Sequence, residues 1–160
     1  MLDIDLAWLA GIWDGEGSIT MFSHTEKTGS KKICPTCVVV NTDINIIAEV
    51  QRILLEMGCN FVIHEYKPEN VKHKLQWRIT TRNQRYIKIL LEHLRPYLKG
   101  EKKAKADIVL RYCKQRIEKM ERLPSKGSTP YDEDDWSFLE QFRSPETTRE
   151  TPSGDDIVRS

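Results

Sequence analysis

Two carboxylates, Asp14 and Glu16, lie beside glycines at the end of the first helical pattern in the chain. The C-terminal end of a helix already carries partial negative charge, so an acid there costs a few tenths to about 1 kcal/mol. A bound cation such as Mg²⁺, which prefers carboxylate, carbonyl and water oxygens, would offset this cost. The same spacing also fits two solvated acids beside glycines that end the helix. The residue types alone leave both interpretations open.

The helix that presents these acids, expected over residues 4–15, is apolar on nearly every side. Such a helix is normally buried against more than one neighbour. One face carries large core residues, whereas a second face carries small residues that would let another helix backbone approach closely. The second face and its neighbours form the predicted helix contact: Ala7, Trp8, Gly11, Ile12 and Gly15.

Alternating and helical patterns then predict elements in the order α-β-β-α-β-β-α-α. The strands are expected over about residues 18–24, 33–41, 61–67 and 74–81. The second helix is expected to start at a cap, Asn41 or Thr42, and to end at Gly58, and the third to start at Asn83. A basic helix is expected over about residues 101–122 and a short one over about 132–143. Antiparallel hairpins with helices on one face form an α+β fold whose other sheet face is open.

The charge of the chain is divided unequally. Residues 1–123, the expected core domain, contain 21 lysines and arginines against 15 acids, a balance of +6. Residues 124–160, expected to form a C-terminal helix and an acidic, partly flexible tail, contain 4 against 9. A basic body suits a polyanion such as double-stranded DNA, because neutralising phosphates releases counterions. A solvated surface of mixed charge would give the same count.

The sequence contains no pattern of a membrane or secreted protein. No apolar run approaches the ~18 residues that a membrane span needs, and the first residues are acidic. Cys34 and Cys37 have the spacing of a redox pair or half a zinc site, but they precede a valine run, which favours ordinary strand residues. Unpaired thiols suit a reducing, intracellular setting.

The stretch LAGIWDGEG, residues 9–17, resembles the LAGLIDADG motif of the homing endonucleases. The resemblance implies an αββαββα fold with a saddle-shaped antiparallel sheet, to which an extra C-terminal helix is added here. It also implies that Glu16 binds the metal, that the Gly15 carbonyl is a second contact, and that Asp14 supports the helix end. Because the motif occurs once, the resemblance implies a homodimer on a palindromic or nearly palindromic DNA site.

The similarity extends to LRPYLK and KKAKA at the start of the basic helix. In the family a lysine approaches the active site there, which implies a catalytic role for Lys102 and a DNA contact for Lys103. A phosphate-binding or solvated face fits the same lysines. The polar residue with which the family positions water aligns with Thr42, which fits a helix cap equally well. An arginine of some relatives falls near Ile46 and is absent.

A saddle-shaped sheet can lie in the major groove, where each base pair has its own donor and acceptor pattern. The third strand has two alternative registers, and the one that buries Phe61 and Ile63 turns His64 and Tyr66 to the DNA. An ordinary exposed strand position remains the alternative for each residue. The expected strand contacts are Thr20, Phe22, His24, Val39, Asn41, His64, Tyr66, Lys74, Gln76, Arg78 and Thr80. The expected backbone contacts are Lys31 and Lys32 in the first hairpin and, by resemblance to homodimeric members, Thr148 and Arg149 in the tail.

Together these features predict a site-specific homing endonuclease that makes staggered double-strand cuts with Mg²⁺. Mn²⁺ is expected to substitute for Mg²⁺, and Ca²⁺ to support binding without cleavage. The alternatives are an intron RNA maturase or a DNA-binding regulator, which keep the same fold without cutting, and a basic scaffold domain. The expected location is a chloroplast or mitochondrion or a prokaryotic cytoplasm.

Overall fold

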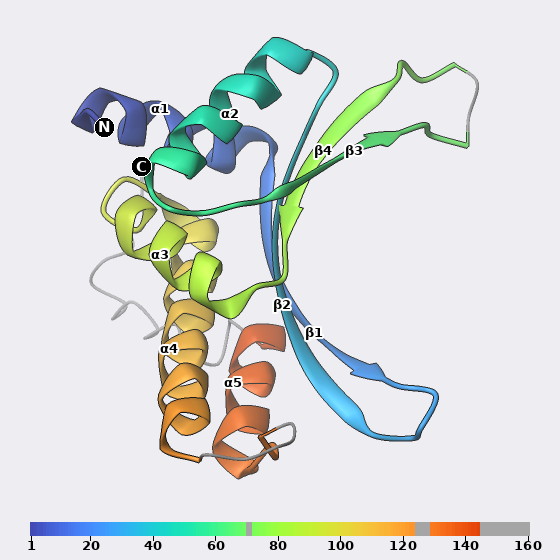
Figure 1. Ribbon diagram of the computed structural model, residues 1–160, viewed down its shortest axis with the longest axis vertical. Helices are drawn as coiled ribbons and strands as arrows, with labels where there is room; N and C mark the ends of the chain where they lie inside the picture. Colours follow the sequence, from blue (N-terminus) through green and yellow to red (C-terminus); the bar gives the residue numbers. More distant parts are fainter. Residues whose placement is uncertain (70–71, 124–128, 145–160) are drawn as a thin grey trace, which may run out of the picture.

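The computed structural model describes residues 1–69, 72–123 and 129–144, and Figure 1 shows their arrangement. The predicted order of elements is confirmed, and the predicted short helix follows it as α5. The bounds are α1 Asp3–Glu16, β1 Gly17–Thr25, β2 Lys31–Asn41, α2 Ile44–Glu56, β3 Val62–Tyr66, β4 Gln76–Thr81, α3 Gln84–Leu94, α4 Gly100–Arg122 and α5 Glu133–Arg143.

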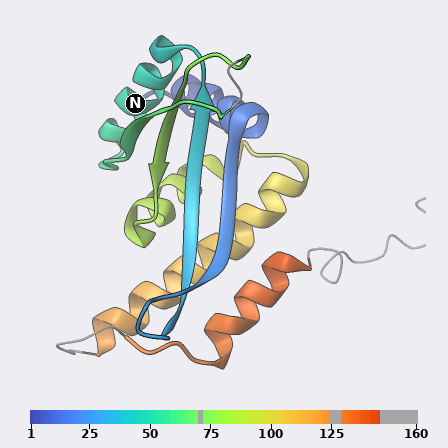
Figure 2. The ribbon, with the colours of Figure 1, turned by 90° about the vertical axis from the view of Figure 1, so that its right-hand side faces the viewer.

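The four strands form one antiparallel sheet in the order β1-β2-β4-β3. The helices gather on one face of this sheet, and Figure 2 shows the opposite face without a covering layer. In Figure 1 both hairpins curve away from the helices, so that the uncovered face is concave. The fold is therefore the expected α+β arrangement with a saddle-shaped sheet. We call this uncovered side the open face.

Alternation along the strands separates a buried set from the open face. On β2 every second residue from Ile33 to Val39 is buried, and on β1 Ile19 pairs with Cys37 in the same buried layer. Val39 is fully buried, so its predicted DNA contact is wrong. Asn41 shares its alternation with Val39 and not with the open face. The prediction failed because the Val38-Val39-Val40 run has no polar side to reveal which valines point inward.

The helix starts show which capping predictions hold. The side chain of Asn83 accepts hydrogen bonds from the amides of Arg85 and Tyr86, as predicted for the start of α3. At α2 the N-cap is Asp43, which accepts from the Asn45 amide, and neither Asn41 nor Thr42 caps this helix. The prediction placed the cap one or two residues early because all three side chains have capping chemistry.

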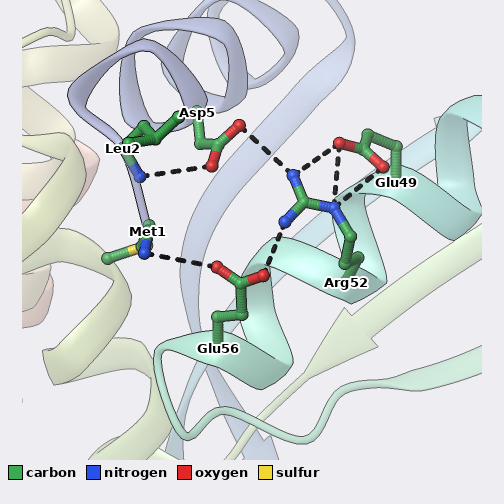
Figure 3. A network of polar contacts seen from close by, with 6 residues as sticks. All are labelled: Met1, Leu2, Asp5, Glu49, Arg52 and Glu56. Carbon is green, nitrogen blue, oxygen red and sulfur yellow. Dashed lines mark hydrogen bonds and ion pairs between the residues drawn. The ribbon is translucent and has the colours of Figure 1, made fainter.

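Arg52 of α2 fixes the beginning of α1, as Figure 3 shows. Its guanidinium contacts Asp5 of α1 at 3.2 Å and Glu49 and Glu56 of its own helix at 2.6 Å each. Glu56 also lies 3.6 Å from the amino group of Met1. Exposed ion pairs contribute only about 0–1 kcal/mol each, but three carboxylates around one guanidinium define where α1 starts.

A buried ion pair holds α5 against α4. Arg116 of α4 and Asp135 of α5 are 3% and 0% exposed, and Nη1 of Arg116 lies 3.2 Å from the carboxylate. The same guanidinium donates to the backbone carbonyls of Thr129 and Pro130 and stacks on Tyr131 with Cζ 4.0 Å from the ring centroid. Removing one partner of such a pair typically costs about 3–5 kcal/mol. The short C-terminal helix is therefore an integral part of the fold.

Candidate active site and nucleic-acid surface

The carboxylate of Glu16 lies exposed at the junction of α1 and β1. Its Oε2 accepts a hydrogen bond from Nδ2 of Asn41 at the end of β2. Oδ1 of Asn41 accepts a hydrogen bond from the Asp43 amide at 2.7 Å, so the side-chain amide is held from both ends. Sequence reasoning missed this contact, because the pairing of Asn41 with an acid 25 positions earlier depends on how the sheet folds back.

The turn from α1 into β1 requires a residue without a side chain at position 17. A Cβ added to Gly17 would lie 2.7 Å from Cδ1 and 2.8 Å from Cα of Trp13. Trp13 has no room to yield, because it is fully buried and packs edge-on against Phe61 with ring centroids 6.3 Å apart. This close approach sets the direction in which β1 leaves the helix, and therefore the position of Glu16.

Lys102 of α4 hydrogen-bonds to the backbone at the same end of α1. Its Nζ donates to the carbonyls of Trp13 at 2.6 Å, Asp14 at 2.9 Å and Gly17 at 2.7 Å. These three bonds use all three protons of the ammonium group. Burial lowers the pKa of Lys102, and the negative charge of Asp14 opposes this shift. The positive charge expected to compensate Asp14 and Glu16 at this negative helix end is therefore supplied in part by Lys102.

This geometry revises the predicted role of Lys102. A lysine that polarises water or contacts a phosphate needs a free N–H, and all three are engaged with backbone here. Lys102 is therefore a residue that positions the Gly15-Glu16-Gly17 turn. The Gly15 carbonyl is not among its acceptors. Glu16 and Gly15, the two predicted metal ligands, thus remain adjacent oxygen donors at an exposed turn.

Two further residues predicted for this region lie at the surface. Thr42 is exposed in the bend between β2 and α2, and Lys103 is exposed in the first turn of α4. Catalysis by Thr42 and a DNA contact by Lys103 stay predictions.

The open face of the sheet carries the other predicted contacts. Eight of them alternate with the buried residues as expected, which selects the register that buries Phe61 and Ile63 against the core. None of the strand positions on this face is Asp or Glu, whereas Lys32, Arg78 and two histidines, His24 and His64, are present. The eight predicted residues are Thr20, Phe22, His24, His64, Tyr66, Gln76, Arg78 and Thr80.

A groove of about 600 Å³ runs over β4 on this face, and Thr36, Val38, His64 and Thr80 contribute to its lining. Arg78 also lines it, with its Cζ 4.6 Å from the ring centroid of Tyr66. Nε of Arg78 is buried and has no hydrogen-bond partner among the described residues. An arginine held against an aromatic ring suits a ligand that offers acceptors to its terminal N–H groups.

A second arginine on the open face, Arg82, was absent from the predicted contacts. It follows β4 directly, and its Cζ lies 5.7 Å from the ring centroid of Phe22 on β1. The signal was available in the sequence, because Arg82 continues the alternation of Arg78 and Thr80 by one more step. The prediction ended the strand at Thr81 and therefore overlooked it.

The predicted phosphate contacts differ in availability. Nζ of Lys32 lies 2.6 Å from Glu26, and this contact raises the pKa of Lys32 and lowers that of Glu26. Lys31 is exposed. Lys74 was predicted as a contact from the last strand, but β4 begins at Gln76, and Lys74 is exposed in the connection before it. The remaining two, Thr148 and Arg149, lie outside the described residues.

The outer face of α1 is bare and apolar. Leu2, Ile4 and Trp8 are 67%, 71% and 37% exposed. A Cβ added to Gly11 or Gly15 would meet nothing within 4 Å, so the fold of one chain does not require glycine at either position. Of the other predicted interface residues, Ala7 is exposed, whereas Ile12 packs partly against the core. The helix therefore has the exposed small-residue stripe that the sequence predicts.

Other kinds of site find little support. All four cysteines are free, and Cys34 and Cys37 are strand residues of β2, as predicted. Burial raises the pKa of the Cys37 thiol, which opposes redox chemistry. Among the described residues, no three His, Cys, Asp or Glu side chains are grouped to hold a metal ion. Within the same ranges, no helix is both long and apolar enough to cross a membrane.

Comparisons with known proteins agree with this geometry. The family model of the LAGLIDADG-like domain matches residues 3–95. No curated protein matches the chain. Among solved structures, the homing endonuclease I-CvuI, in complex with the I-CreI target in the presence of Mg and with the DNA not cleaved, is similar at a TM-score of 0.56 and 22% identity. The match covers 88% of this chain and 95% of that chain.

Two further structures show how the length of this chain compares with that of its relatives. The archaeal intron-encoded homing endonuclease I-Vdi141I, complexed with DNA, matches at a TM-score of 0.57 and 14% identity over 88% of this chain and 98% of that chain. I-GzeII, in complex with its DNA target, matches at a TM-score of 0.59 and 16% identity, over 89% of this chain but 44% of that chain. The I-GzeII chain is thus roughly twice as long.

Proposed function

This chain belongs to the LAGLIDADG homing-endonuclease family, and we propose that it cuts a specific double-stranded DNA site as a homodimer with a divalent metal ion. The proposal is carried by the position of Glu16. This exposed carboxylate ends a helix whose outer stripe is bare, and it directly precedes the first strand of a sheet whose open face has no acidic strand residues. A partner helix and a DNA duplex would meet at this point.

The oxygen donors at the turn fit Mg²⁺. The Glu16 carboxylate and the Gly15 carbonyl are hard oxygen ligands, the type that Mg²⁺ prefers, and the remaining positions would be filled by water and phosphate oxygens. When bound, the metal would lower the pKa of a water molecule and stabilise negative charge on the scissile phosphate. Mn²⁺ is expected to substitute, and Ca²⁺ to permit binding without cleavage. One chain offers a single carboxylate that is predicted to bind the metal, Glu16, so a second is expected from the partner.

Packing of α1 against the α1 of a second copy would supply that acid. Exposed glycines in a helix cost about 0.5–1 kcal/mol each relative to alanine, and the single chain gains nothing from Gly11 or Gly15 in return. Close approach of a partner backbone would account for both. Two-fold symmetry then implies a palindromic or nearly palindromic target with one cut in each strand.

Residues of this chain would prepare the Glu16 carboxylate without taking part in bond cleavage. Asn41 donates a hydrogen bond to this carboxylate, and Lys102 holds the neighbouring backbone in place through its hydrogen bonds to carbonyls. Because three carbonyls occupy the ammonium group of Lys102, its charge acts on the turn and at short range on Asp14. Thr42, one residue from Asn41, remains our candidate for orienting the attacking water.

The sheet would enter the major groove with its open face. Arg78 can donate two hydrogen bonds to guanine, and Gln76 can pair in the same way with adenine. Lys31 and Lys103 carry exposed positive charge and suit phosphate contacts.

The test is cleavage of a randomised palindromic DNA library by the purified protein, with Mg²⁺ and separately with Ca²⁺. We expect discrete cuts with Mg²⁺ and sequence-selective binding alone with Ca²⁺. Glu16→Gln should abolish cleavage and retain binding, whereas the control Glu140→Gln, at an exposed position of α5, should cut normally. Selective binding without cleavage in either ion would favour a regulator or, with intron RNA, a maturase. Cleavage by Glu16→Gln would contradict the assigned centre.

A further inference from the structure

The pair formed by Arg82 and Phe22 bridges three strands of the open face. Arg82 follows β4, Phe22 belongs to β1, and β2 lies between these strands in the sheet. Phe22 pairs with Cys34 and Thr81 pairs with Cys37, so the arginine side chain crosses β2 to reach the ring. The guanidinium carbon lies 5.7 Å from the ring centroid, within the range of a cation–π contact.

The guanidinium is held in place but its donors are not used. Among the residues that the structure describes, Arg82 forms no ion pair with an acid and no side-chain hydrogen bond. Phe22 is 37% exposed, so part of its surface is open on the same side as the guanidinium. Thr20 and His24, its neighbours on the same face of β1, carry no negative charge that would compete for the arginine. Five N–H groups in a fixed plane are therefore available to a ligand above the sheet.

We propose that Arg82, held on the ring of Phe22, recognises one guanine in the major groove of each half-site. This inference rests on the proposed DNA-cutting function. The forked donor edge of arginine matches O6 and N7 of guanine, which both accept hydrogen bonds. A stacked guanidinium loses less freedom on binding than a mobile one, so the aromatic ring would sharpen the preference. A phosphate contact would use the same charge but would carry no sequence information.

A second pair of the same kind provides an internal control. Arg78 stacks on Tyr66 and precedes Arg82 by four residues, which corresponds to roughly 13 Å along an extended strand. The two guanidinium groups are thus placed to contact different base pairs. Loss of one arginine should remove the preference at one position and leave the other intact.

The experiment selects bound sequences from a randomised duplex library in Ca²⁺, with the full-length wild type, Arg82→Met, Phe22→Leu and Arg78→Met. Methionine keeps an unbranched apolar stem and removes every donor. We expect Arg82→Met to lose guanine at one symmetric pair of positions. Its affinity for the wild-type site should fall about 5- to 150-fold per half-site, the usual range for one bidentate base contact, and the losses at the two half-sites multiply. Phe22→Leu should weaken the same positions, and Arg78→Met should affect a different pair.

A uniform loss of affinity for all sequences in Arg82→Met, with unchanged preferences and a smaller salt dependence, would identify a phosphate contact and overturn the proposal. Unchanged affinity and preferences in Arg82→Met would also overturn it, without contradicting the proposed DNA-cutting function. If the wild type enriched no sequence at all, the proposed function itself would fail and this inference with it.

Discussion

Replacing Lys102 by methionine should destabilise the protein before any DNA or metal is added. The substitution keeps an apolar stem of similar length and removes three hydrogen bonds, at 2.6, 2.9 and 2.7 Å, to the carbonyls that end α1. A hydrogen bond to a charged group contributes about 1.5–3 kcal/mol, but three bonds from one ammonium group are not additive. We therefore expect a loss of about 2–4 kcal/mol in unfolding free energy, or about 5–15 °C in Tm for a chain of this size.

The measurement is urea and thermal unfolding in EDTA, at one protein concentration, because self-association also raises apparent stability. Lys103→Met is the matched control: its side chain is exposed in the same turn, so its stability should stay within about 0.5 kcal/mol of wild type. Lys102→Arg should not restore stability fully, because a planar fork cannot aim three donors as an ammonium group does. If Lys102→Met unfolds like the control but has lost cleavage, the lysine acts on the reacting groups and the positioning role is wrong.

Three other substitutions test separate parts of the structure. Gly11→Ala should raise the unfolding free energy of the dilute protein by about 0.5–1 kcal/mol, through the helix preference of alanine, and should weaken self-association in sedimentation experiments; undiminished association would argue against the α1 interface. Asn41→Ala should slow cleavage about tenfold, the kinetic equivalent of one hydrogen bond to a carboxylate. It should also raise the half-saturating Mg²⁺ concentration and leave DNA affinity in Ca²⁺ unchanged. An unchanged Mg²⁺ dependence would mean that Asn41 does not position Glu16. Lys32→Met should return the lowered pKa of Glu26 toward 4.5 in a carboxyl NMR titration. In the wild type this hairpin contact is present above the pKa of Glu26 and is lost as the pH falls through it, and an unmoved pKa would show that the ion pair is not formed in solution.

The order of the elements was predictable because each follows from local periodicity. Ile47, Val50, Ile53 and Leu54 recur at helical spacing in α2 and are all fully buried. Gly58 was predicted to end that helix, and it has a φ of +82°, a conformation that glycine adopts easily. Local patterns of this kind need no knowledge of the partner elements.

The sequence-based predictions were wrong or incomplete where the position of a side chain depends on a distant part of the chain. Val39 was assigned to the open face because a valine run has no polar side, although the step from Lys32 to the buried Ile33 at the start of β2 marks the alternation. Asn41 and Lys102 contact the end of α1 from 25 and 85–89 positions away. Local spacing cannot place such contacts, since they depend on how the sheet and α4 pack around α1.

The two ends of α1 are fixed by different means, and this bears on how the proposed centre would assemble. Arg52 holds its beginning through Asp5, and Lys102 holds its end through three carbonyls, while only the stripe containing Gly11 is left bare. Both anchors come from the same chain, so the position of Glu16 relative to its own sheet does not depend on a partner. A second copy would then add its carboxylate to a turn that is already in place, without the cost of ordering it. Ordering a flexible segment during association weakens binding. Because α1 is already fixed at both ends, this loss would be smaller both for dimerisation and for metal binding.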